Sequence, residues 1–287
     1  MILHSLLERI EAARGLDPVA GKLADAVGAA VGPTPVKNLL HGTWLGHPAH
    51  PLLTDLPIGA WAAAAVLDVV GGRRSRAGAD TLVGFGVAAA LPTVATGAAD
   101  WSEYNDQRVR RVGTVHALAN SVALSLYLAS LAARRRGHRT KGVALSFLGL
   151  GALSVGGYLG GHLSYGLASG VDRTTFDQGP DDWQDVLAAA SLEKGIPRRA
   201  DAGGVPVVVV AGDDRIHALA ARCSHMGGPL DQGEVDDGCI QCPWHGSVFR
   251  LDDGSVQRGP AAAPQPRFEA RVVEGRVQVR AAHRPTT

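Results

Sequence analysis

The sequence predicts a two-part chain, in which a membrane α-helical bundle of four transmembrane helices is followed by an all-β antiparallel sandwich. Composition is the first reason: 46% of the 287 residues are hydrophobic and only 19% are charged, which is too apolar for an ordinary soluble protein. The second reason is that the apolar residues gather between about 52 and 170. The third is a series of short β-type runs, separated by turn residues, after about residue 202. The net charge of +1 argues against a nucleic-acid partner.

Residues 1–40 are predicted to be an N-terminal amphipathic segment. Leu6, Leu7, Ile10 and Ala13 recur at helical spacing among scattered charges, which is typical of a helix lying on a membrane or on the rest of the protein. Neither a basic start with a long apolar run and a cleavage site nor a twin-arginine signal is visible, so we expect no removable targeting peptide.

Residues 41–171 are predicted to contain four membrane-spanning helices. Each apolar segment provides the roughly 20 residues that a helix needs to cross a hydrocarbon core of about 30 Å. Asp55, Pro57 and Asp68 interrupt the first segment, and glycines at small-xxx-small spacing in the last segment permit close helix contact. An even number of helices places both ends of this domain on one membrane face. The predicted segments are 52–70, 81–99, 112–133 and about 143–171.

Residues 172–283 are predicted to form the β domain. Turns rich in aspartate and glycine separate its apolar runs, as an antiparallel sandwich requires. A short helix over 183–192 is expected to pack beneath the sandwich, and the tail after His283 is expected to be disordered. The predicted strands are 205–211, 216–221, 239–241, 247–251, 267–273 and 276–279.

Two cysteine–histidine motifs on two loops of the β domain offer ligands for one metal centre. The sequence reads C-S-H-M-G-G-P-L from Cys223 and C-P-W-H-G-S from Cys242. Two thiolates and two imidazoles can hold a tetrahedral zinc ion. They also suit a 2Fe–2S cluster in which two cysteines hold one iron and two histidines hold the other. The candidate metal ligands are Cys223, His225, Cys242 and His245.

The surroundings of the ligands favour the iron–sulfur cluster. Neighbouring glycines let the backbone approach a buried sulfide, and a proline in each loop stiffens it. Both motifs closely resemble those of the ferredoxin-like members of the Rieske family. The resemblance implies that the two cysteines bind an inner iron, while His225 and His245 bind an outer, exposed iron through which electrons pass. It also implies that Ser247 contributes a hydroxyl that bonds the cluster.

Three positions depart from the Rieske proteins of quinol-oxidising complexes. Gly228 and Trp244 stand where that branch has two disulfide-forming cysteines, and Phe249 replaces a tyrosine whose hydroxyl bonds the cluster. Fewer hydrogen bonds to the sulfurs stabilise the reduced cluster less, so we expect a potential below the quinol-oxidising type. Cys239 suggests either a C-x-x-C redox pair with Cys242 or a small buried strand residue, and the second interpretation is favoured.

Four histidines fall at one face of the predicted bundle: His47, His50, His116 and His162. Ionisable groups at membrane depth are costly and usually have a purpose. One interpretation is a second cofactor site, in which His116 and His162 ligate a haem b or another metal and His47 and His50 form a second pair. The favoured alternative is that these residues are hydrogen-bonded and hold the helices in register, and a quinone pocket is a third.

A second resemblance concerns the membrane part. The motif H-P-A-H-P-L-L-T-D-L-P-I-G from His47, with G-G-H-L-S-Y from Gly160, resembles an uncharacterised family of small bacterial four-helix membrane domains that are sometimes fused to Rieske domains. The resemblance covers roughly residues 38–173 and implies topology more than function.

The signals for membrane orientation conflict. The loops after the first and third helices carry eight positive charges against five at the opposite face, which places the β domain outside the cell. A cluster is normally built in the cytoplasm and no export signal is visible, which favours the cytoplasmic side. Both orientations in a bacterial cytoplasmic membrane therefore stay open.

The predicted function is membrane-anchored electron transfer, with a 2Fe–2S cluster passing one electron to or from a redox partner protein or quinone. A quinol- or haem-coupled oxidoreductase subunit and a redox sensor with a membrane anchor are the alternatives. No nucleophile, flavin or nicotinamide motif is recognisable, so we predict no catalytic residue. An oxygenase terminal component is not expected, because no residues remain for its 2-His-1-carboxylate iron domain.

Overall fold

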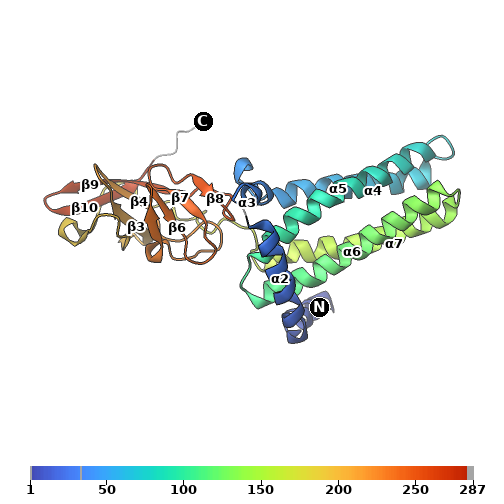
Figure 1. Cartoon of the computed structure of the whole chain (residues 1–287), viewed down its shortest axis with the longest axis horizontal. Helices are drawn as coiled ribbons and strands as arrows, with labels where there is room; N and C mark the ends of the chain where they lie inside the picture. Colours follow the sequence, from blue (N-terminus) through green and yellow to red (C-terminus); the bar gives the residue numbers. More distant parts are fainter. Residues whose placement is uncertain (1, 33, 283–287) are drawn as a thin grey trace. The chain divides into compact units, whose positions relative to one another are not determined.

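The structure, a computed structural model, describes residues 2–32 and 34–282 and divides into two compact units (Figure 1). The first unit comprises Met1–Gly32 and Ala49–Ser169, and the second comprises Pro33–Pro48 and Gly170–Thr287. The units do not follow the chain order, because the segment before the first membrane helix packs with the β domain. The tail predicted after His283 lies outside the described residues.

Four long helices form the body of the first unit, as predicted. Within residues 2–32 and 34–282, these four are the helices long and apolar enough to cross a membrane. The second and third helices begin and end a few residues beyond their apolar segments. The first begins earlier and ends at the predicted residue, and the fourth begins earlier but ends before residue 171. The helices are α4 (Ala49–Val70), α5 (Arg76–Ser102), α6 (Gln107–Arg135) and α7 (Arg139–Gly161), and α7 continues into the π-helical turn η3 (His162–Gly166).

The bundle has a narrow core and an apolar exterior. Helix α4 packs mainly on α5 and α6 on α7, while α5 with α6 and α4 with α7 complete the ring. In the core the rings of Trp61 and Tyr127 stack with centroids 4.0 Å apart. Large apolar side chains point outward, such as Leu91, Leu118 and Leu148, each more than 60% exposed. A helix that is apolar on its outer face as well suits contact with lipid.

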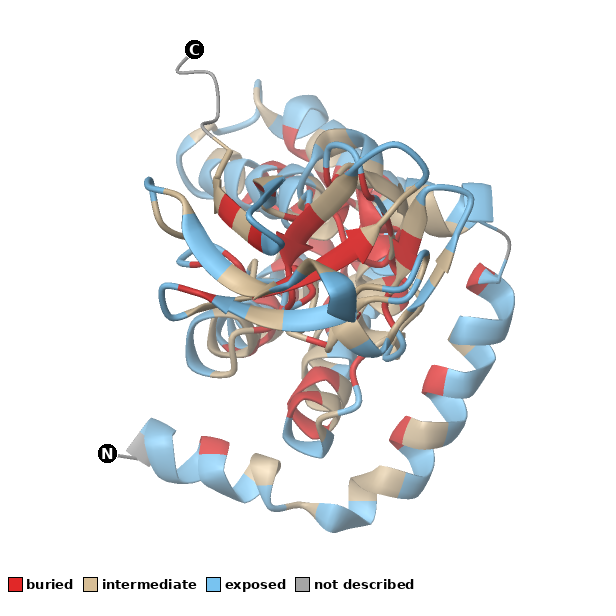
Figure 2. Cartoon of the chain, turned by 90° about the vertical axis from the view of Figure 1, so that its left-hand side faces the viewer, coloured by how far each residue is buried: buried red, intermediate tan, exposed pale blue. Residues whose placement is uncertain are grey.

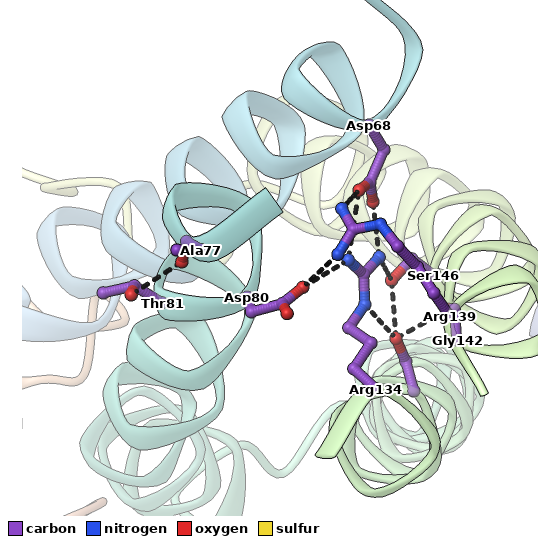
Figure 3. Close-up of polar contacts among 9 residues, drawn as sticks. Asp68, Ala77, Asp80, Thr81, Arg134, Arg139, Gly142 and Ser146 are labelled. Atoms are coloured by element: carbon purple, nitrogen blue, oxygen red, sulfur yellow. Dashed lines mark hydrogen bonds and ion pairs between the residues drawn. The ribbon is translucent and has the colours of Figure 1, made fainter. Parts of the chain in front are cut away.

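Four charged side chains close the end of the bundle that carries the α4–α5 and α6–α7 loops (Figure 3). Arg134 donates to both Asp68 and Asp80, the latter at 2.8 Å. Arg139 donates to the same two carboxylates, at 2.6 Å to Asp68 and 2.9 Å to Asp80. Two positive and two negative charges balance, so this Arg134 network links all four helices without an uncompensated charge.

Two N-terminal helices pack on the bundle. Leu7 of α1 (Ile2–Glu11) joins Val112 and Leu159 in a small apolar core, so the amphipathic segment lies on protein here. Asp17, the first residue of α2 (Asp17–Val31), accepts hydrogen bonds from Arg111 at 2.6 and 2.7 Å. These bonds hold the pKa of Asp17 below its ordinary value.

The second unit is the predicted antiparallel β domain, preceded by α3 (Thr34–His41). Strands of the described chain form a six-stranded sheet in the order β1-β10-β9-β4-β3-β2 and a four-stranded sheet in the order β5-β6-β7-β8. All their pairings are antiparallel. The strands are β1 (Gln184–Ala188), β2 (Arg198–Ala202), β3 (Val205–Ala211), β4 (Ile216–Ala220), β5 (Glu234–Asp236), β6 (Cys239–Gln241), β7 (Val248–Arg250), β8 (Val256–Arg258), β9 (Arg267–Val273) and β10 (Arg276–Ala281).

The helix predicted over 183–192 is wrong. Residues Gln184–Ala188 form strand β1, which pairs with β10, and a short 3-10 turn, η4 (Ala189–Ser191), follows. Pairing with β10 satisfies the backbone of both strands, and Val186 and Leu187 pack against an apolar core. The sequence reasoning missed this strand because its register depends on a partner about 90 residues away.

Two apolar cores fill the β domain, and the buried positions lie along its inner strands (Figure 2). One core is formed by side chains from the six-stranded sheet, among them Val207, Phe268 and Val277. The other contains Leu230 and Phe249 together with both motif cysteines. The second core therefore forms one wall of the candidate site.

Candidate metal centre

The two motif loops adopt the same backbone conformation. In each loop, the backbone N–H of the cysteine donates to the carbonyl of the fifth residue after it. The N–H of the fourth residue donates back to the carbonyl of the cysteine, and all four distances are 2.8 to 3.0 Å. The fourth position after the cysteine has a positive φ, 78° at Gly227 and 71° at Gly246. Glycine adopts this conformation without steric cost. The repeated glycine spacing thus builds two matching turns, one after Cys223 and one after Cys242.

The thiols of Cys223 and Cys242 form a buried pair. Each residue is 1% exposed, and their sulfurs lie within hydrogen-bonding reach of each other. The N–H groups two and three residues after each cysteine donate to its sulfur. The hydrogen bond between the thiols raises the pKa of Cys223, which burial raises further, and lowers that of Cys242. The two loops therefore direct four N–H groups at the sulfurs of the two predicted ligands.

The imidazoles of His225 and His245 form a second pair. Their ring centroids are 5.0 Å apart and their planes are nearly perpendicular, at 88°. Two imidazoles on one tetrahedral metal, each nitrogen about 2 Å from it, have ring centres about 5 Å apart. In the described part of the chain, no three His, Cys, Asp or Glu side chains converge on one metal position. Pairing of like with like suits a two-iron cluster better than a single zinc ion with four ligands.

Comparison with known proteins agrees with this geometry. Residues 182–269 match the family model of the Rieske [2Fe-2S] domain. Ferredoxin CarAc of Metapseudomonas resinovorans is 34% identical over 98 residues, which cover 34% of this chain and 92% of that protein.

The chain belongs to the Rieske family. The anthranilate 1,2-dioxygenase ferredoxin subunit of Burkholderia cepacia is 30% identical to its Rieske domain over 98 residues, 34% of this chain and 91% of that protein. Human apoptosis-inducing factor 3 is 33% identical over 103 residues, which cover 34% of this chain but 17% of that protein. The chain therefore spans a small part of that larger relative, and the likeness is confined to the Rieske domain.

The membrane part matches a family as well. Residues 46–173 match the model of a predicted membrane protein family, DUF2231. Together with the four apolar helices, this match confirms the predicted fusion of a Rieske domain to a four-helix membrane domain.

A buried glutamine that the motif analysis missed supports the first Rieske loop. Gln265 is 2% exposed, and its Oε1 accepts a hydrogen bond from the Ser224 N–H at 3.0 Å. Its Nε2 donates to the carbonyls of Ala220, at 2.8 Å, and Arg222. The Ser224 hydroxyl donates to the Ala263 carbonyl at 2.8 Å. Gln265 thus joins the loop to β4 and to the segment before β9.

Gln265→Leu is expected to loosen the first Rieske loop. The change leaves three buried backbone groups without their partner, at a cost of about 1–3 kcal/mol for each that stays unsatisfied. We expect the visible absorbance of the loaded cluster to be lost at a lower temperature than in the wild type. Gln278→Leu, on the sheet surface, is the matched control and should melt as the wild type does. Equal melting of both variants would contradict the role assigned to Gln265.

An arginine and a serine support the second Rieske loop. Arg258 donates to the Gly246 carbonyl at 2.9 and 3.0 Å and to the Gln241 side chain at 2.9 Å. The Ser247 hydroxyl is fully buried and accepts from the Ala261 N–H at 3.0 Å. Because this bond uses the oxygen as acceptor, the O–H stays able to donate. The predicted role of Ser247 toward the cluster requires this donor.

Helix α3 attaches to the edge of the four-stranded sheet beside the second loop. Asn38 donates to the Gln257 carbonyl at 3.1 Å and accepts from the Gly259 N–H at 2.9 Å, so its amide pairs with edge strand β8 as a neighbouring strand would. Lys37 Nζ lies 3.5 Å from the carbonyl of His245. No sequence signal pointed to this contact, which joins segments more than 200 residues apart.

The structure brings together two of the four membrane histidines. His50 and His116 have ring centroids 6.4 Å apart. His162 instead bonds Glu11 of α1 at 2.8 Å, and His47 belongs to the second unit, where its Nδ1 bonds the Pro48 carbonyl at 2.9 Å. This pairing differs from the one predicted by counting helices, which joined His116 to His162.

Proposed function

We propose that this chain is a membrane-anchored electron carrier of the Rieske type. In this proposal Cys223 and Cys242 hold one iron of a 2Fe–2S cluster, and His225 and His245 hold the other. The observation that carries the proposal is that the predicted ligands form two pairs. The two thiols bond each other, and the two imidazole rings have centroids 5.0 Å apart. When bound, the cluster takes up and gives up one electron. Two ferredoxins, each covered over more than 90% of its length, support this assignment.

The two ligand pairs have different surroundings, which favours electron access from the histidine side. The cysteines are buried in an apolar core, where they are shielded from water. The histidines are half-buried, and the adjacent Trp244 is 54% exposed. A redox partner approaching this surface reaches the imidazoles first. We propose a redox partner protein or a quinone in this role, and an oxygenase is one candidate because a relative is a dioxygenase ferredoxin subunit.

The helices supply the anchor in this proposal. The chain passes between the helical unit and the Rieske unit at three points, after Gly32, after Pro48 and before Gly170. A domain held by three connections has less freedom to travel than one on a single linker. We therefore propose transfer beside a bacterial cytoplasmic membrane to a partner that comes to the cluster.

The test is a spectrum and a titration of the purified full-length chain. We expect about two iron atoms and two labile sulfides per chain, a Rieske-type EPR signal after dithionite reduction, and a potential below that of quinol-oxidising Rieske proteins. Cys223→Ser should lose the signal, whereas Cys239→Ser should keep it, because Cys239 lies on β6 outside the ligand pairs. Zinc without iron or sulfide would refute the proposal.

A further inference from the structure

The histidine pair inside the bundle comes from helices that face each other across its core. His50 lies at the start of α4 and His116 lies on α6. Helices α5 and α7 flank both of them. The two imidazole rings are 6.4 Å apart between centroids, with planes at 81°. Side chains that converge from facing helices are the usual way in which bundles build cofactor sites.

Each of these imidazoles is oriented by a backbone carbonyl of a flanking helix. His50 Nδ1 lies 2.9 Å from the Thr93 carbonyl of α5, and His116 Nδ1 lies 2.8 Å from the Gly156 carbonyl of α7. A carbonyl oxygen only accepts, so each Nδ1 carries the proton and each Nε2 carries a lone pair. The amide nitrogen of Asn120 donates to the His116 carbonyl at 2.9 Å and lies 3.4 Å from Nδ1 and 3.2 Å from Nε2, so this amide has to turn away from Nε2 when a metal binds there. A histidine fixed in this way is typical of metal ligation.

Glycines make room for both rings. A Cβ added at Gly97 of α5 would lie 2.6 Å from the His50 ring, and one at Gly160 of α7 would lie 3.1 Å from the His116 ring. A larger residue at Gly97 would displace the imidazole. These glycines therefore position the pair, in addition to permitting close packing of the helices.

The distance between the rings distinguishes two ways of binding a metal. Two imidazoles on opposite sides of one metal, each nitrogen about 2 Å from it, have ring centres about 6 Å apart, against about 5 Å for neighbouring tetrahedral positions. The Rieske pair, with 5.0 Å, fits the tetrahedral value. The membrane pair, with 6.4 Å, fits the opposed arrangement.

The remaining coordination positions point to the kind of cofactor. Among residues 2–32 and 34–282, no third His, Cys, Asp or Glu converges with the pair on one metal position. An iron between opposed imidazoles still needs four equatorial ligands, and an apolar bundle offers little water. A porphyrin supplies four nitrogens within an apolar ring. We propose that His50 and His116 are the axial ligands of a haem b, which gives the chain a second one-electron centre independent of the Rieske cluster.

The experiment compares four single variants of the full-length chain, purified in detergent from haem-supplied cells. We expect the wild type to contain about one haem b per chain, as measured by its pyridine haemochrome. His50→Ala and His116→Ala should each lose more than nine-tenths of this haem, while His47→Ala and His162→Ala keep it. The Rieske EPR signal should be unchanged in all four, so failure of either centre is recognised separately.

Two further measurements separate ligation from folding. His116→Met replaces one ligand with another, so it should retain haem with a changed ferric spectrum. Added imidazole should restore the spectrum of His50→Gly. The proposal is overturned if the wild type carries its Rieske cluster but no haem, if it carries quinone in place of haem, or if both alanine variants keep haem. A His116→Met spectrum identical to the wild type overturns it as well.

Discussion

Arg134→Ala is expected to destabilise the helix bundle by about 3 kcal/mol, the lower end of the cost of breaking a buried ion pair. The side chains of Arg134 and Asp68 are 1% and 0% exposed. Removing the arginine leaves Asp68 with Arg139 alone, which donates to it at 2.6 Å and is itself 23% exposed. The Ser146 hydroxyl, 3.1 Å from the guanidinium, also loses its contact. In the variant, the two carboxylates of the network in Figure 3 thus keep only one of their two arginines.

Arg135→Ala is the matched control, because Arg135 is adjacent in the chain, equally charged and exposed. It should change the free energy of unfolding by less than about 0.5 kcal/mol. Both variants are compared by the temperature at which the detergent-solubilised protein loses its folded fraction. If the two melt alike, the Arg134 network does not hold the loop end of the bundle together.

Gly228→Ala should reduce iron incorporation to less than about a tenth of the wild type, because ligand positions tolerate displacements of only about 0.5 Å. A Cβ at this position would lie 2.8 Å from Cys242 Sγ and 3.1 Å from two atoms of the Trp244 ring. Real Cβ atoms do not approach a sulfur so closely, so the sulfur of the predicted ligand has to move. The measurement is iron and labile sulfide per purified chain.

The control for this variant is Gly275→Ala. Gly275 has φ 76° in the β9–β10 turn, and a Cβ there meets no atom within 4 Å. Alanine costs about 1 kcal/mol or more in this left-handed conformation, yet it touches no predicted ligand, so iron should be retained. Full iron content in Gly228→Ala would show that the second loop yields, and that glycine at 228 is not needed for the sulfur position.

The predicted ligand set came from short-range information. The ligands of each motif lie two or three residues apart, and matching glycine turns place the two cysteines beside each other and the two histidines beside each other. That they bind iron stays a prediction, although the Rieske family itself is shown. Gln265 and Asn38 were missed, because nothing in the neighbouring sequence indicates which distant backbone groups a side-chain amide bonds.

Long apolar runs and ligand motifs are local properties, so the amino-acid order alone determined four helices apolar enough to cross a membrane, a β domain and the ligand types of its candidate metal centre. Contacts between distant segments depend on how helices rotate and strands align. Only the tertiary structure therefore decided that His116 faces His50, that Arg134 alone of three consecutive arginines is buried among carboxylates, and that β1 is a strand. In each case a polar group is stabilised by a partner from a distant segment of the chain. The residues next to it in the sequence do not show which partner that is.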